Sequence, residues 1–242
     1  MRDAVMFISD IHANYHVIDA QVDHAEAELG IPVTEVLVLG DFGFFNDDLH
    51  AFFRRKKRRF RRPVSFIEGN HEDHGAMEAL VASYADVITH LPRGTVHDTG
   101  PWRCLCLGGA RYMDAWSTPR GCEITEADVA DCLVHAPDAV DLVITHDCPV
   151  GIGVPNTPGL EHYGQPGVPA LNRIAEHFRP QLWIFGHHHR WHEATRDGTH
   201  YLGLPQSWVG YALMDRTGEI RSVRHEVPVQ TSSRWRRWFG LR

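Results

Sequence analysis

Short, continuously apolar runs recur along the chain, each bounded by glycine, proline or polar residues. Runs of this length are typical of strands that are buried on both faces of a sheet. They predict buried strands at 5–9, 36–39, 64–67, 141–145 and 183–185. Amphipathic stretches predict helices at 15–29, from 47 or 48 to about 60, and at 77–84, 125–133 and 171–178. Further short strands are expected at 87–89, 95–97, 103–107, 199–204, 210–214 and 221–227.

Two segments depart from this pattern. Residues 147–170 contain five glycines and five prolines, which predicts a long irregular loop of the kind that usually carries function. Residues 231–242 mix arginine with Trp235, Trp238 and Phe239. We interpret this tail as a helix that packs its aromatic rings on its own domain, with a membrane-surface or partner-binding helix as the alternative.

The length of 242 residues allows one sizeable core, and neither an internal repeat nor a linker interrupts the pattern. We therefore predict a single domain over 1–242, with residues 170–242 completing a second sheet. A strand that starts by Val5 leaves no room for a signal peptide. No run approaches the roughly 18 apolar residues of a membrane span. The five cysteines are odd in number and lack C-x-x-C spacing, which indicates reduced thiols in a cytoplasmic protein.

A basic run covers residues 54–62, where eight of nine side chains are arginine or lysine. The favoured interpretation is a solvated helix face. The alternative is a patch that attracts phosphate-rich partners such as nucleic acid. The overall net charge of −7 argues against a general nucleic-acid binder, which is usually basic.

Metal-ligand residue types follow five of the apolar runs. Residues two apart in an extended segment project the same way. Asp10 and His12 can therefore share one cation, His187 and His189 can face one centre, and His188 should point elsewhere. If the strands lie side by side in one sheet, their carboxyl ends converge on a single place. This pattern predicts a metal site. Its members are Asp10, His12, Asp41, Asn70, His71, His146, His187 and His189.

Without His71, this set contains two carboxylates, one amide oxygen and four imidazoles. Seven ligands exceed what one transition metal takes and suit two ions that share a bridging carboxylate. These ligand types favour manganese, with iron or zinc as alternatives, over calcium or copper(I). Two divalent ions about 3.5–4 Å apart can activate a water as a bridging hydroxide and clamp phosphoryl oxygens. The chain has no P-loop, G-x-G-x-x-G, H-E-x-x-H or G-x-S-x-G motif to support another chemistry.

The ordered series of these residues resembles the calcineurin-like metallophosphoesterase family. The resemblance spans residues 10–189 and rests on Asp10-x-His12, Gly40-Asp41, Gly69-Asn70-His71-Glu72, Thr145-His146 and Gly186-His187-x-His189. It implies an α/β (α+β) fold, a four-layer α-β-β-α sandwich of two mixed sheets. It also implies that Asp10, His12 and His189 hold one metal, that Asn70, His146 and His187 hold the other, and that Asp41 bridges. His71 matches the family's non-ligand histidine, which contacts the phosphate or protonates the leaving oxygen.

The sequence departs from the protein Ser/Thr phosphatase branch of that family. That branch follows Gly-Asp with Val-Asp-Arg-Gly, whose aspartate orients the catalytic histidine, whereas Asp41 is followed by Phe42-Gly43-Phe44-Phe45-Asn46. Asp73 and Glu72 are the alternatives for the orienting role. The missing element favours a diester or nucleotide-type substrate over a phosphomonoester or phosphoprotein.

Substrate contacts are expected from Asn70 and from two loops. One loop carries Arg111, Tyr112 and Asp114, and the other carries His162 and Tyr163. Of these we select Asn70, Arg111 and His162, with loop stabilisation as the alternative role for the loop residues. A non-catalytic scaffold on the same fold is a further alternative, although such relatives typically lose ligands, and here every ligand and His71 is present.

Overall fold

Two six-stranded sheets form the centre of the molecule in the computed structural model, which describes residues 3–113 and 118–229. The strands of the first sheet lie in the order β12 (Ile220–Arg224), β11 (Gly210–Asp215), β1 (Ala4–Ile8), β2 (Val33–Leu39), β3 (Val64–Ile67) and β4 (Thr89–His90). Those of the second lie in the order β5 (Thr95–Thr99), β6 (Trp102–Leu107), β7 (Leu142–Thr145), β8 (Leu182–Phe185), β10 (Thr199–Gly203) and β9 (His192–Arg196). Each sheet is parallel at its centre and antiparallel toward one or both edges, so both are mixed.

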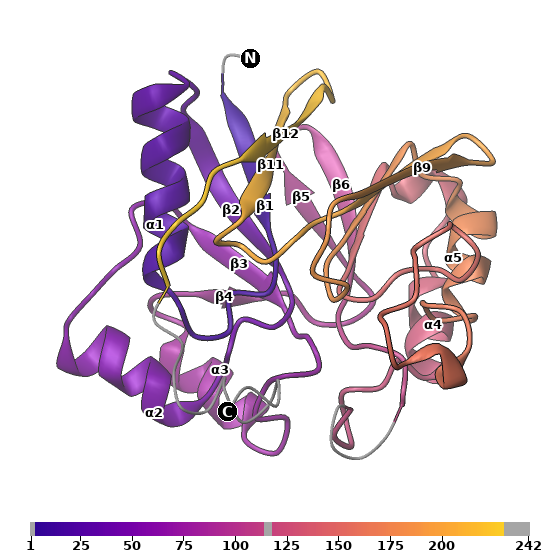
Figure 1. The fold of residues 1–242 in the computed structure, drawn as a ribbon, viewed down its shortest axis with the longest axis horizontal. Helices are drawn as coiled ribbons and strands as arrows, with labels where there is room; N and C mark the ends of the chain where they lie inside the picture. Colours follow the sequence, from indigo (N-terminus) through magenta and orange to yellow (C-terminus); the bar gives the residue numbers. More distant parts are fainter. Residues whose placement is uncertain (1–2, 114–117, 230–242) are drawn as a thin grey trace.

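Alternation along the strands explains the layers. In β1, Val5 and Phe7 join an apolar cluster shared with the second sheet, whereas Met6 and Ile8 join a cluster that contains helix residues. Because successive side chains point to opposite faces, a strand with apolar residues at every position is buried on both faces. The predicted four-layer α-β-β-α sandwich is therefore confirmed (Figure 1).

Helices cover the outer face of each sheet. On the first sheet, α1 (His16–Asp23) contributes Ile18 and Val22, and α3 (Met77–Tyr84) contributes Leu80 and Tyr84. On the second sheet, α4 (Glu126–Cys132) and α5 (Leu171–Phe178) supply the apolar side chains of the outer cluster. Figure 1 shows α1 and α2 (Asn46–Leu49) on one side of the molecule and α4 and α5 on the other. Two π-helices, η1 (His24–Glu28) and η2 (His50–Arg55), extend α1 and α2, and two short 3₁₀ turns span η3 (Pro137–Ala139) and η4 (Glu161–Tyr163).

The sheet arrangement differs in part from the sequence expectations. The strands that precede the metal-ligand residues belong to two sheets, so the condition that they lie side by side in one sheet is not met. Residues after 170 supply β8, β9 and β10 to the second sheet, as predicted, but β11 and β12 pair into the first sheet through β1. The edge strand β9 was not predicted, since its mostly exposed residues carry no apolar alternation. The predicted tail helix lies outside the described residues.

The basic run is not one helix face. The helix ends with η2 at Arg55, and Lys57 has a left-handed backbone with φ of 50°, so the rest of the run is irregular. Acidic neighbours pair with four of its side chains: Arg54 and Arg59 contact Asp86, Arg61 contacts Asp23, and Arg62 contacts Glu26. Exposed pairs of this kind contribute little stability, but they reduce the positive potential that the run presents.

Within the described residues, every helix is too short or too polar to cross a bilayer.

Candidate metal centre

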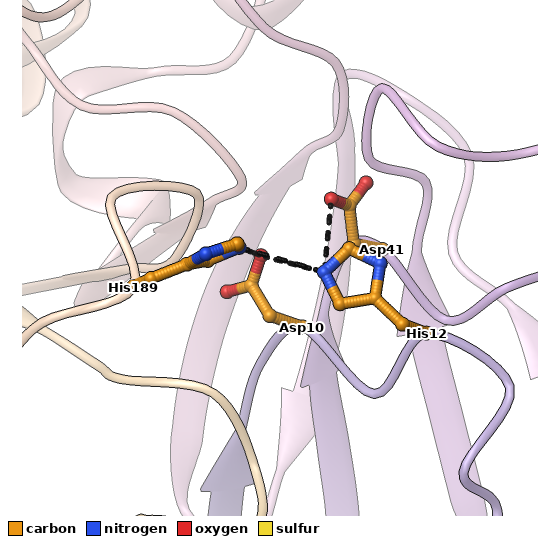
Figure 2. Close-up of side chains that lie close together, drawn as sticks. All are labelled: Asp10, His12, Asp41 and His189. Atoms are coloured by element: carbon orange, nitrogen blue, oxygen red, sulfur yellow. Dashed lines mark hydrogen bonds and ion pairs between the residues drawn. The ribbon is translucent and has the colours of Figure 1, made fainter. Parts of the chain in front are cut away.

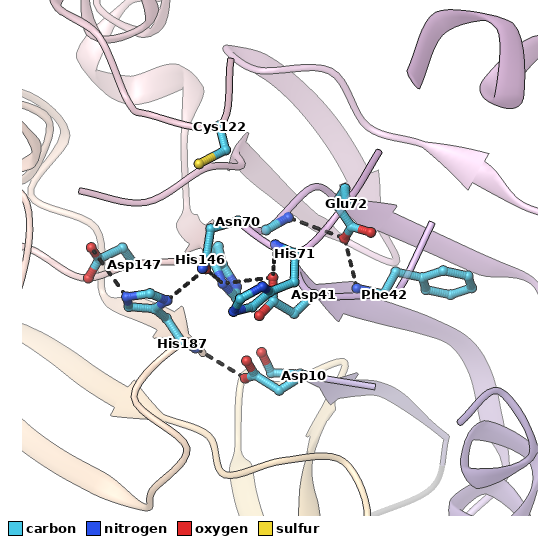
Figure 3. Close-up of polar contacts among 12 residues, drawn as sticks. Asp10, Asp41, Phe42, Asn70, His71, Glu72, Cys122, His146, Asp147 and His187 are labelled. Atoms are coloured by element: carbon cyan, nitrogen blue, oxygen red, sulfur yellow. Dashed lines mark hydrogen bonds and ion pairs between the residues drawn. The ribbon is translucent and has the colours of Figure 1, made fainter. Parts of the chain in front are cut away.

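The strand ends meet across the gap between the two sheets. Asp10, Asp41 and Asn70 follow strands of the first sheet, and His146 and His187 follow strands of the second. Figure 3 shows these side chains pointing toward one another from both sheets. A hydrogen bond connects the residues that follow the two sheets: the backbone N–H of His187 donates to Oδ2 of Asp10 at 3.1 Å.

The backbone is left-handed and not extended at five of the seven candidate ligands. The φ angles are 55° at Asp10, 48° at His12, 51° at Asp41, 65° at His187 and 53° at His189. Asp10 and His12 lie close together as predicted, but the predicted reason, an extended backbone, is wrong, since the chain turns at both residues. Left-handed non-glycine residues cost about 1–2 kcal/mol each and cluster at functional sites.

Glycines beside the ligands leave room for them. A Cβ at Gly40, whose φ is +85°, would collide with the ring of His146. A Cβ at Gly186 would collide with Oγ of Ser9. The glycines of two sequence motifs are thus explained by the close approach of neighbouring side chains and, at Gly40, by backbone conformation.

One group of donor atoms comprises Asp10, His12, Asp41 and His189 (Figure 2). Their ligand atoms all lie within 4.8 Å of one another. Nε2 of His189 lies 3.1 Å from Oδ1 of Asp10 and 3.4 Å from Nε2 of His12. Such an arrangement of oxygen and imidazole donors could hold a divalent transition metal ion.

A second group surrounds Asn70. Its Oδ1 lies 3.0 Å from Nε2 of His146 and 3.0 Å from Nδ1 of His187. Asp41 stands between the groups, with Oδ1 at 3.4 Å from Nε2 of His146 and Oδ2 at 3.7 Å from Nε2 of His12. Each carboxylate oxygen of Asp41 thus faces a different group.

Hydrogen bonds outside the centre orient the imidazoles. Nδ1 of His146 lies 2.7 Å from the carbonyl oxygen of Leu39, which can only accept, so this nitrogen carries the proton and Nε2 offers its lone pair to the centre. His188 points elsewhere, as predicted: its Nε2 lies 3.0 Å from Oδ1 of Asp147 and 3.3 Å from Sγ of Cys148.

Burial and charge favour the metal-binding protonation states of His12, His187, Asp10 and Asp41. At His189, by contrast, burial is outweighed by Asp10, which raises the pKa. Burial lowers the pKa of His12 to about 4 and that of His187 to about 3, against the opposing pull of nearby carboxylates. Burial would raise the pKa of Asp41, but His146, His71 and His12 outweigh it and lower the value to about 2. In Asp10 the histidines likewise overcome burial and hold the pKa well below its ordinary value. Neutral imidazoles and ionised carboxylates are the forms that bind cations, so the residues fit divalent ions.

The loop after Asp41 is held by Glu72. Its buried carboxylate accepts hydrogen bonds from the N–H groups of Phe42 at 2.8 Å and Phe44 at 2.5 Å, and a longer one from Gly69 at 3.4 Å. Burial, followed by the charge of Asp41, raises the pKa of Glu72 to about 8. The three hydrogen bonds engage both oxygens, since Phe42 and Gly69 donate to Oε1 and Phe44 donates to Oε2.

His71 lies at the edge of both groups. Its N–H donates to Oδ1 of Asp41 at 2.8 Å, and its ring centroid is 5.6 Å from that of His12. Burial lowers its pKa, partly offset by Asp41. Asp73 accepts from the N–H of Ala76 at 3.2 Å, and the Glu72 carboxylate holds backbone groups, so an orienting role of either acid toward the imidazole stays a prediction.

A cavity of about 490 Å³ opens onto the centre. Asn70 and Arg111 line it, as predicted for substrate contacts, and so does Tyr163. His162 is exposed with its ring against Tyr163 and is not among the lining residues, so its contact with substrate stays a prediction. Tyr112 is 54% exposed, and Asp114 lies outside the described residues.

Two charged residues of the cavity, Arg190 and Asp147, were not selected from the sequence. Arg190 bonds the carbonyl oxygens of His188 and Pro155. Asp147 is buried and accepts from the N–H of Arg111 at 2.9 Å while contacting His188. Each of the two directly follows a candidate metal ligand in the sequence, Asp147 after His146 and Arg190 after His189. This adjacency is the sequence feature that could have indicated a place in the site.

Comparison with known proteins agrees with this geometry. The family model for calcineurin-like phosphoesterases matches residues 4–191. A search of curated protein sequences gave no match. Among solved structures, the chain is similar to TT1561 of Thermus thermophilus, with a TM-score of 0.60 and 14% identity over 93% of this chain and 99% of that one.

Two further structures share the fold. The phosphopantetheinyl hydrolase of Mycobacterium tuberculosis has a TM-score of 0.56 and 14% identity, covering 96% of this chain and 98% of that one. A putative 5′-nucleotidase from Staphylococcus aureus has a TM-score of 0.55 and 14% identity, covering 96% of this chain and 55% of that one. Because the family model covers most of its length, the chain belongs to the calcineurin-like phosphoesterase family.

Proposed function

We propose that this protein is a hydrolase of phosphoric esters that uses two divalent metal ions, with a diester or nucleotide-type substrate favoured. The family supports phosphoester hydrolysis in general. The single observation that carries the dinuclear proposal is the position of Asp41, whose two carboxylate oxygens face His146 and His12 in separate donor groups.

In this proposal Asp10, His12 and His189 hold one ion, Asn70, His146 and His187 hold the other, and Asp41 bridges them. Bound ions of this kind activate a water for in-line attack and neutralise charge on the phosphoryl oxygens. The donor set of imidazole, carboxylate and amide favours manganese, with iron or zinc as alternatives.

The chain's own residues have separate tasks. Asp41 and Asp10 supply negative charge that partly offsets the ions, while Leu39 fixes the proton of His146 on the nitrogen away from the centre. His71 lies where it can contact a phosphoryl oxygen or donate a proton to the leaving oxygen.

The substrate proposal rests on the cavity. Its volume of about 490 Å³ suits a ligand larger than inorganic phosphate. Arg111 and Arg190 line it as cations, and Tyr163 and Leu160 add partly apolar surface, a combination that fits a nucleotide or an organic diester. Two structural neighbours, the phosphopantetheinyl hydrolase and the putative 5′-nucleotidase, are named for substrates in the same range, although their likeness to this chain is one of fold.

Cytoplasmic action is part of the proposal, supported by five cysteines that are all free and buried. Nucleic acid as the substrate is the less favoured option, since acidic residues pair with four of the basic side chains in the 54–62 run. A non-catalytic scaffold is the remaining alternative.

Hydrolysis of model esters tests the proposal. Metal-stripped protein resupplied with manganese should hydrolyse p-nitrophenyl phosphate or its bis ester, and the preferred ester separates monoesterase from diesterase. Mutation of a residue that only hydrogen-bonds to a metal ligand lowers metal affinity or activity by about 10–100-fold. Asp41 is proposed as a ligand itself, so Asp41→Asn should lower turnover by at least about 100-fold. Asp98→Asn, which changes an exposed acid in β5 that does not line the cavity, serves as the control. Metal-loaded protein that turns over neither ester would favour the scaffold or a narrow substrate.

A further inference from the structure

A second cluster of metal-ligand side chains lies away from the proposed centre. His24 and Glu28 belong to η1, and His225 directly follows β12. The ligand atoms of the three residues lie within 4.8 Å of one another. The two imidazole rings stack with centroids 3.8 Å apart and an interplanar angle of 7°.

Gln21 fixes the proton on His225. The side chain of Gln21 is buried, and its Nε2 donates to the carbonyl oxygens of Ser207 at 2.7 Å and His225 at 3.0 Å. Because both amide hydrogens are used in this way, Oε1 is the atom that lies 2.8 Å from Nδ1 of His225, and it must accept. Nδ1 therefore carries the proton. In the neutral form of this ring, Nε2 has the lone pair that can bind a metal ion.

A comparable contact orients His24. Its Nδ1 lies 2.7 Å from the hydroxyl of Tyr211, which is buried, while its Nε2 lies 3.7 Å from Oε2 of Glu28. Burial, and then the neighbouring His225, lowers the pKa of His24, which favours the neutral ring that a metal requires. Both imidazoles are thus anchored through Nδ1, as metal-binding histidines usually are.

We propose that His24, Glu28 and His225 form a separate metal site for a borderline divalent ion, with zinc as the expected occupant. Two imidazoles and one carboxylate suit zinc, nickel, cobalt or copper(II) better than magnesium or calcium. The Glu28 side chain is 70% exposed, so water completes the coordination. This site does not depend on the proposed catalytic function.

Binding requires a small local movement. A metal ion lies in the plane of each imidazole that binds it, and the two rings are now nearly parallel. Their Nε2 ends must therefore splay, with the hydrogen bonds to Tyr211 and Gln21 serving as pivots. The bound ion would join the end of the first helical segment to the chain after the last strand of the first sheet, which adds stability by linkage.

Metal counting tests the site in the whole protein. Protein saturated with manganese is dialysed against zinc at a series of concentrations, and both metals are counted by mass spectrometry. The total number of metal ions per chain should rise by one above the manganese-saturated value, whatever manganese the zinc exchanges at the proposed centre, and the unfolding midpoint should rise by several degrees. Glu28→Gln, a change at an exposed side chain, and His225→Gln should each weaken zinc binding at least about tenfold and reduce the rise in midpoint.

His16→Gln is the matched control. His16 also links α1 to the chain after β12, since its Nε2 lies 3.2 Å from the carbonyl oxygen of Pro228, but it does not belong to the cluster. This variant should keep the additional zinc ion. Anomalous diffraction at the zinc edge should place a peak between His24 and His225. Zinc that enters only by displacing manganese, or that binds equally to Glu28→Gln and the wild type, would overturn the proposal.

Discussion

The Nδ1 atom of His146 lies 2.7 Å from the carbonyl oxygen of Leu39, which joins the end of β7 in one sheet to the end of β2 in the other. Because the carbonyl can only accept, this bond fixes the imidazole proton away from the centre. The lone pair of Nε2 is thereby directed to Asn70 and Asp41. A contact between the sheets therefore determines the chemistry of a ligand.

Substitution of that ligand should remove one of two metals. We expect His146→Ala to bind one manganese ion per chain where the wild type binds two, because Asn70 and His187 would lack their third partner. The count is measured after equilibrium dialysis. His188→Ala is the control within the same histidine-rich sequence, since its ring contacts Asp147 and Cys148 instead of the centre. Equal loss of metal from both variants would contradict the assignment.

Glu72 should be important for stability. Its carboxylate accepts from three backbone N–H groups, and in Glu72→Gln an amide N–H would face at least one of these donors. Leaving a buried donor unsatisfied costs about 1–3 kcal/mol, so the free energy of unfolding should fall by about that amount in a urea titration of metal-free protein. Asp73→Asn should change it by under about 1 kcal/mol, and similar effects of the two substitutions would argue against this role.

The proposed acid role of His71 predicts a dependence on the leaving group. His71→Ala should slow hydrolysis of alkyl phosphate esters by about 100-fold or more, because a poor leaving group needs a proton. Esters of p-nitrophenol, which leave without one, should slow by less than about tenfold. Equal slowing across a series of leaving groups would restrict His71 to contact with the phosphate.

The cysteines should behave as core residues. All five are buried, and burial raises the pKa of the Cys148 thiol well above its ordinary value even though its sulfur lies 3.3 Å from Nε2 of His188. A thiol-specific reagent should therefore modify none of them rapidly in the native protein at neutral pH, and all five after unfolding. Rapid modification of Cys148 in the native state would instead identify a reactive thiol beside the cavity.

Apolar patterning predicted the elements better than their arrangement. The bounds of β3, α3 and α5 agree residue by residue with the predicted ranges 64–67, 77–84 and 171–178. Pro63 and Gly69 mark the ends of β3, and Pro169 and Pro180 mark those of α5. The helix expected to continue to about Phe60 ends at Arg55, because a basic sequence gives no signal for the left-handed turn at Lys57. Assignment of β11 and β12 to the first sheet depends on long-range pairing, which local patterns do not encode.

The identities of the candidate ligands could be predicted, but the way they converge could not. Asp10, Asp41 and His187 occupy left-handed backbone that non-glycine residues rarely adopt, so the assumption of extended backbone after the strands did not predict how these side chains approach one another. The part played by Glu72 in holding the loop after Asp41 was also hidden, because its partners at Phe42 and Phe44 are backbone groups that any residue provides.

Anomalous diffraction from crystals soaked in manganese tests the central claim most directly. The two donor groups on either side of Asp41 predict two manganese peaks about 3.5–4 Å apart. One peak should lie beside Asp10, His12 and His189, and the other beside Asn70, His146 and His187. A single peak, or two peaks that do not share Asp41, would contradict a dinuclear centre bridged by this residue.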